Sequence, residues 1–116
     1  MRRAAFERLV AQALDGLPKH FAERLRNIAV IVEARPSHEI AAELGGDILG
    51  LYQGVSELEQ SPMAAYELPE IVVIYQQNIE AICRSDAEIV EEVRKTVVHE
   101  IGHHFGLSDA EMEEWG

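Results

Sequence analysis

Two histidines four residues apart constrain the possible structure and chemistry of this chain more than any other feature. His99 and His103 belong to the sequence His-Glu-Ile-Gly-His, at the end of a stretch whose apolar spacing predicts one long helix. On a helix, residues i and i+4 project from one face about one turn apart, so both imidazoles can bind one zinc ion. Glu100 lies about 100° around that helix from His99. There its carboxylate can reach a water bound to the ion, which is the position of a general base.

The residues after the second histidine supply a candidate third ligand. Gly106 can end the helix in the left-handed conformation, so that the chain turns back and Asp109 brings its carboxylate to the metal. His104 is the alternative third ligand, but it projects about 100° away from His103. Two imidazoles, one carboxylate and an open fourth position are typical of a catalytic zinc site. We therefore predict one Zn²⁺ per chain, with the ligands His99, His103 and Asp109.

The motif and several other segments resemble the zincin metallopeptidases, and most closely the small bacterial family of minimal zincin-like metallopeptidases. The matching segments cover most of the chain after about residue 45 and comprise residues 47–55, 68–75, 79–80 and 96–106. The resemblance implies a zincin-like α+β fold and a zinc-dependent peptidase. In such an enzyme Glu100 would accept a proton from the activated water and pass it to the leaving amine.

The α+β fold that the resemblance implies has a small mixed sheet packed on an N-terminal helix and a C-terminal active-site helix. Ser37 and Ser85 are candidate N-caps. Helices are expected over residues 3–15, from Pro18, over 38–44 and from Ser85, and strands over 28–32, 48–53 and 71–75. The order strand, helix, strand within residues 28–53 predicts a right-handed crossover between two parallel strands.

The predicted active-site helix separates an apolar face from the histidine face. At 100° per residue, its aliphatic residues fall within about 80° of one another, roughly opposite His99 and His103. The helix should therefore bury this stripe under the sheet and present its histidines to a cleft. The stripe consists of Val90, Val93, Val97 and Ile101.

In zincins a peptide substrate binds as an added strand along an exposed sheet edge above the zinc helix. The candidate edge here begins at Gly50, and the candidate substrate-binding residues are Gly50, Leu51 and Tyr52. A glycine in a strand permits close approach of another backbone, but a bulge or turn explains it equally well. Tyr52 or Tyr75 is a candidate hydrogen-bond donor to the oxyanion, and the sequence does not choose between them.

Length and charge exclude several classes of function. The 116 residues predict a single domain spanning residues 1–116, and the formal net charge of −11 argues against a nucleic-acid partner. No run of about 18 apolar residues is present, so no membrane span is expected. Cys83 is the single cysteine, which excludes an intrachain disulfide and fits a reducing compartment. We expect a cytoplasmic protein.

The expected partner is a peptide or protein substrate. We expect no counterpart of the C-terminal subdomain that walls the specificity pocket in larger zincins, so a partner protein or a dimer is a candidate to complete the pocket. The alternative function is a non-catalytic metal-binding or protein-interaction module that retains the zincin motif. Glu100 argues against this alternative, because a purely structural metal site does not need a general base.

Overall fold

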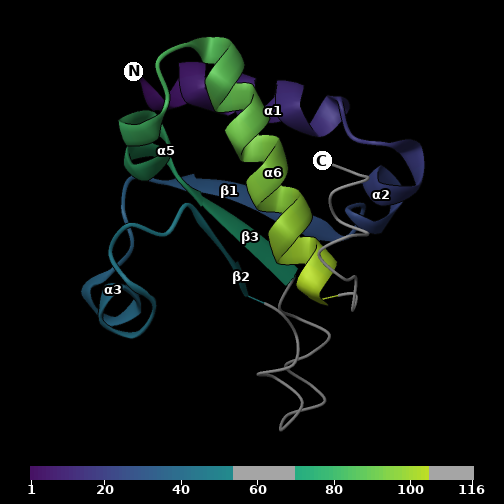
Figure 1. The fold of residues 1–116 in the computed structure, drawn as a ribbon. Coiled ribbons are helices and arrows are strands. Elements are labelled where there is room, and N and C mark those ends of the chain that lie inside the picture. Colours follow the sequence, from purple (N-terminus) through teal and green to yellow (C-terminus); the bar gives the residue numbers. More distant parts are fainter. Residues whose placement is uncertain (54–69, 105–116) are drawn as a thin grey trace, which may run out of the picture.

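The computed structural model describes residues 1–53 and 70–104, which form helices and strands in mixed order (Figure 1). Every helix and strand predicted in these residues is present, and the predicted α+β class is confirmed. The strand expected over residues 48–53 begins two residues later than predicted. The elements are α1 (Arg3–Asp15), α2 (Lys19–Arg24), β1 (Ile28–Glu33), α3 (His38–Leu44), β2 (Gly50–Gln53), β3 (Glu70–Tyr75), α5 (Gln76–Ile82) and α6 (Asp86–His104).

The three described strands form one mixed sheet in the order β1-β3-β2. β1 pairs with β3 in parallel, whereas β2 pairs with β3 in the antiparallel direction. The predicted parallel pairing of the first two strands is therefore wrong, because β3 lies between them. The reason lies in burial: β3 is buried on both faces from Val72 to Tyr75, as a central strand requires, whereas β2 is only partly buried and lies at the edge.

One face of the sheet packs against α1 and α6. The apolar residues of α1 recur at helical spacing, and those of β3 that join the same core alternate along the strand. On α6 the predicted stripe is confirmed, since Val93, Val97 and Ile101 are fully buried and Val90 is partly buried. The other α6 residues in this core are Ile89 and Val98, and β3 contributes Val72 and Ile74.

Both predicted serine caps are present. The Ser37 Oγ accepts a hydrogen bond of 3.2 Å from the Ile40 N–H at the start of α3. The Ser85 Oγ accepts one of 3.1 Å from the Glu88 N–H, which fixes the first turn of α6.

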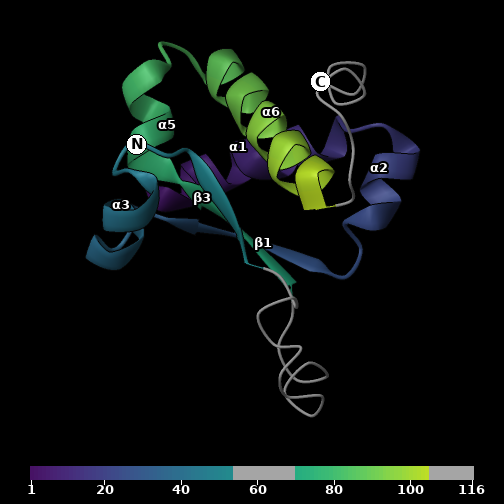
Figure 2. The ribbon, with the colours of Figure 1, turned by 60° about the horizontal axis from the view of Figure 1, so that its bottom comes forward.

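In Figures 1 and 2, α3 lies well away from the C-terminal end of α6. Among the helices that the structure describes, none has the length and apolar character needed to span a bilayer.

Candidate metal centre

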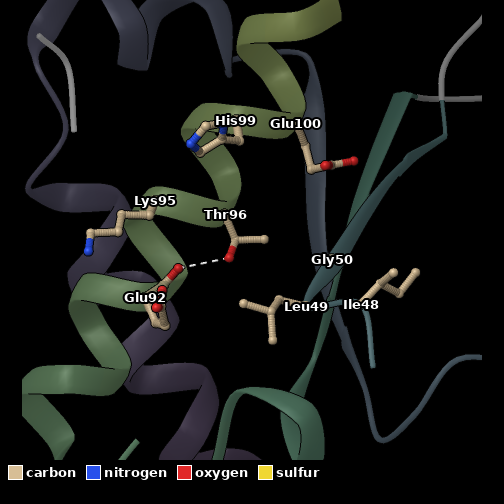
Figure 3. A pocket seen from close by; sticks show the side chains of 8 residues that line it. All are labelled: Ile48, Leu49, Gly50, Glu92, Lys95, Thr96, His99 and Glu100. Carbon is tan, nitrogen blue, oxygen red and sulfur yellow. Dashed lines mark hydrogen bonds between the residues drawn. The ribbon is translucent and has the colours of Figure 1, made fainter. Parts of the chain in front are cut away.

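A pocket of about 390 Å³ lies between α6 and the start of β2 (Figure 3). It brings together residues from both halves of the chain, including three that the sequence singled out: His99, Glu100 and Gly50. Its wall on the β2 side is apolar and its α6 side is polar. The lining residues are Ile48, Leu49, Gly50, Glu92, Lys95, Thr96, His99 and Glu100.

The α6 helix presents His99 of the motif away from the core. α6 continues without a break to His104, so His99 and His103 occupy positions one turn apart on one face. The His99 side chain is exposed and lines the pocket, whereas Ile101 is fully buried in the core. This separation of core and site matches the prediction from the helical pattern.

The Glu100 carboxylate contacts the edge strand. Its Oε1 accepts a hydrogen bond of 2.9 Å from the backbone N–H of Tyr52. In Figure 3 the carboxylate points away from the His99 imidazole and toward the strands. The sequence does not predict this contact, because it joins residues 48 positions apart and involves a backbone group that no sequence pattern marks.

Gly50 lies where β2 crosses α6. A Cβ atom at this position would be 2.6 Å from the Thr96 Cγ2 and 2.9 Å from the Val73 carbonyl oxygen. The Thr96 Oγ1 donates a 2.8 Å hydrogen bond to the Glu92 carbonyl oxygen one turn earlier, which fixes the orientation of the Thr96 side chain. The absence of a side chain at Gly50 therefore lets β2 approach α6 closely.

The two candidate tyrosines lie in different surroundings. Burial, followed by the charge of Glu70 and a side-chain hydrogen bond with it, raises the pKa of Tyr52 to about 12. Tyr52 therefore carries a neutral hydroxyl at physiological pH, on the strand that contacts Glu100. Tyr75 alternates with the core residues Val72 and Ile74 of β3, and its hydroxyl is buried without a hydrogen-bond partner among the described residues. Tyr75 does not line the pocket.

The described residues supply part of the predicted ligand set. Within residues 1–53 and 70–104, no three His, Cys, Asp or Glu side chains come together as a metal site. The predicted third ligand, Asp109, lies outside the described residues. The residues that are described fit a zinc ion: an exposed imidazole at position 99 and a second histidine one turn further along α6. The Glu100 carboxylate lines the same pocket as His99. The ligand roles of His99, His103 and Asp109 remain predictions, as do the substrate-binding roles of Gly50, Leu51 and Tyr52.

Comparisons with known proteins bear on the fold and the family of this chain. The chain matches a solved structure, a conserved hypothetical protein from Thermus thermophilus, at 25% sequence identity and a TM-score of 0.61. The match covers 90% of this chain and 94% of that one. No curated protein matches the chain. The family model described as zincin-like metallopeptidase matches residues 25–116, which include the whole sheet and α6. The chain belongs to the zincin-like metallopeptidase family.

Proposed function

We propose that this protein is a zinc-dependent peptidase in which Glu100 is the general base. One observation carries the proposal: the His99 and Glu100 side chains line a single pocket, between the exposed face of α6 and a strand at the edge of the sheet. Zincin-like metallopeptidases are generally zinc-dependent hydrolases, and the family match covers this part of the chain. An exposed sheet edge is what strand-like peptide binding needs.

The roles of the residues follow from their chemistry. His99, His103 and Asp109 would hold the zinc ion, which supplies a Lewis acid and a water of lowered pKa when bound. Glu100 would accept a proton and deliver it to the leaving amine. Only one of its two carboxylate oxygens, Oε1, receives the Tyr52 N–H, so Oε2 is the oxygen that would take the proton.

We further propose that the substrate is a peptide or protein that binds along β2. This strand lies at the sheet edge and pairs only with β3 among the described strands. Gly50, Leu51 and Tyr52 would contact the substrate, and the outward backbone groups of Gly50 and Tyr52 would bond its backbone, because backbone hydrogen bonds along an edge strand give affinity that tolerates many sequences. The net charge of −11 disfavours nucleic acid as a partner.

The test is to measure bound zinc and peptide cleavage in the wild type, Glu100→Ala and a control variant. Glu43→Ala is a suitable control, because Glu43 is an exposed glutamate on α3, away from the pocket. We expect all three proteins to bind one zinc ion per chain. The wild type and Glu43→Ala should cleave members of a broad peptide library, and Glu100→Ala should be slower by a factor of about 10² or more. Equal cleavage by Glu100→Ala and the wild type would refute the proposal.

A second candidate function is a non-catalytic metal-binding module. The observation that favours it is the Glu100–Tyr52 hydrogen bond, since a carboxylate that ties a helix to a strand also has a structural use. Removal of the metal separates the two functions. A structural zinc should unfold the domain when it is removed, whereas a catalytic zinc on a preformed helix should leave a folded and inactive protein. Circular dichroism before and after treatment with a chelator distinguishes these outcomes.

A further inference from the structure

The backbone N–H of Tyr52 faces away from the sheet. In an antiparallel pair, the residues of each strand alternate between those bonded to the partner strand and those whose N–H and C=O point outward. The Leu49 carbonyl oxygen accepts a 2.9 Å hydrogen bond from the Tyr75 N–H, which makes Leu49 a bonded position. By alternation Leu51 also faces β3, and Gly50 and Tyr52 face the outer edge. The outward N–H of Tyr52 donates instead to Glu100.

The spacing of the helix and the strand makes this contact possible. Gly50 brings β2 against Thr96, where no larger residue fits without a shift of the backbone. From that point, two strand residues advance about 6.6 Å to Tyr52 and four helix residues advance about 6 Å to Glu100. The two advances nearly match. The contact at Gly50 therefore places the Tyr52 N–H beside the Glu100 carboxylate, one helical turn further along α6.

We propose that the backbone N–H of Tyr52 is a positioning group for Glu100. It holds Oε1 across the gap between β2 and α6, and so fixes the rotamer of the Glu100 side chain. The inference rests on the proposed role of Glu100 as the general base. It assigns Tyr52 a function beyond substrate binding, because a peptide that pairs with β2 cannot also take this N–H unless it displaces Glu100. Such a peptide would use the Tyr52 carbonyl and the outward groups of Gly50.

Amide hydrogen exchange tests the contact without reference to activity. Exchange is measured by NMR on the full chain as purified, in the wild type and in Glu100→Ala. An edge N–H without a partner exchanges quickly, so the Tyr52 amide should exchange about tenfold or more faster in the variant. The Leu51 amide, which faces β3, serves as the internal control and should be unchanged. Equal exchange of the Tyr52 amide in both proteins would overturn the proposal.

A second pair of variants tests what the contact does. Tyr52→Pro and Tyr52→Ala both lose the tyrosine side chain, but only proline removes the N–H. Because this N–H points outward, the proline breaks no hydrogen bond to β3. With a library of peptides as the probe, Tyr52→Pro should show a kcat about tenfold or more below that of Tyr52→Ala, at similar KM.

The outcomes separate the two proposals. If the wild type cleaves no peptide, the peptidase function fails, and the exchange measurement still decides whether Tyr52 holds Glu100. If the wild type cleaves and Glu100→Ala does not, the proposed function stands. Equal kcat values for Tyr52→Pro and Tyr52→Ala would then show that the N–H does not position the base. If Tyr52→Pro does not fold, Gly50→Ala replaces it: by moving β2 from α6 it should raise the exchange rate of the Tyr52 amide, and an unchanged rate would overturn the proposal.

Discussion

Gly50 and Thr96 determine how closely β2 approaches α6. The Thr96 Cγ2 methyl would lie 2.6 Å from a Cβ at position 50, which is far inside normal contact distance. Thr96 cannot easily turn this methyl away, because its hydroxyl is hydrogen-bonded to the Glu92 carbonyl oxygen. The spacing between the strand and the helix therefore depends on the absence of a side chain at position 50, and the Tyr52–Glu100 hydrogen bond depends on that spacing.

Gly50→Ala should destabilise the fold by about 1–3 kcal/mol, because the added methyl also meets the Val73 carbonyl oxygen at 2.9 Å and a backbone must move. Gly46→Ala is the matched control. Among the described residues, a Cβ at Gly46 would meet only the Ala41 Cβ, at 3.8 Å, which is an ordinary contact. Urea unfolding of the two variants measures the difference. Equal free energies of unfolding would contradict the argument from close approach.

Ser85→Ala should destabilise the protein by about 1 kcal/mol, because the Glu88 N–H loses its acceptor at the first turn of α6. Ser85→Asp should retain the stability, since aspartate is an equally good N-cap and its charge favours a helix N-terminus. Thermal unfolding of the three proteins checks both expectations. A loss of stability in Ser85→Asp as large as in Ser85→Ala would count against capping.

Ile101→Val should cost about 1 kcal/mol of stability, because Ile101 is 0% exposed and the lost methylene leaves a cavity between α6 and the rest of the core. The same substitution at Ile82, which is 55% exposed, removes an equal group from the surface and should change the stability by less than about 0.5 kcal/mol. Chemical denaturation compares the pair. Similar losses at both positions would show that burial does not explain the effect.

Local signals explain how much of the fold could be predicted. The start of α6 follows from the Ser85 cap, and its helical conformation follows from the 3.6-residue repeat of its buried valines; both are visible in a short window of sequence. The strands β1 and β3 are short runs of apolar residues, many of them β-branched, between turn residues and are equally local. The same signals placed His99 on the exposed face of α6.

Features that depend on contacts between distant segments could not be predicted from the sequence. The sequence places β1 and β2 next to each other in the chain, but their order in the sheet depends on β3, which must be covered on both faces. No local signal carries that information. The Tyr52–Glu100 hydrogen bond also joins distant segments. In addition, its donor is a backbone N–H, which no residue type marks. The glycine at position 50 permits a close approach, but no local signal identifies Thr96 as the neighbour.

The Tyr52 hydroxyl should titrate well above the ordinary tyrosine pKa of about 10. Burial makes the largest contribution to its pKa of about 12, followed by the charge of Glu70 and the hydrogen bond with it. Because the folded-state pKa is raised, the protonated hydroxyl contributes stability that is fully present below about pH 10. This contribution is lost as the pH rises toward 12. Tyr52→Phe should therefore remove part of the alkaline destabilisation.

Glu70→Gln isolates the contribution of the charge. It should lower the pKa of Tyr52 from about 12, while burial keeps the pKa above the ordinary value. Glu33→Gln is the control, because the charge of Glu33 raises the pKa of Tyr75 and is not among the causes for Tyr52. Ultraviolet absorbance of the phenolate, taken as the difference between each protein and its Tyr52→Phe version, reports the Tyr52 titration alone. A wild-type midpoint near pH 10 would show that neither burial nor Glu70 perturbs this hydroxyl.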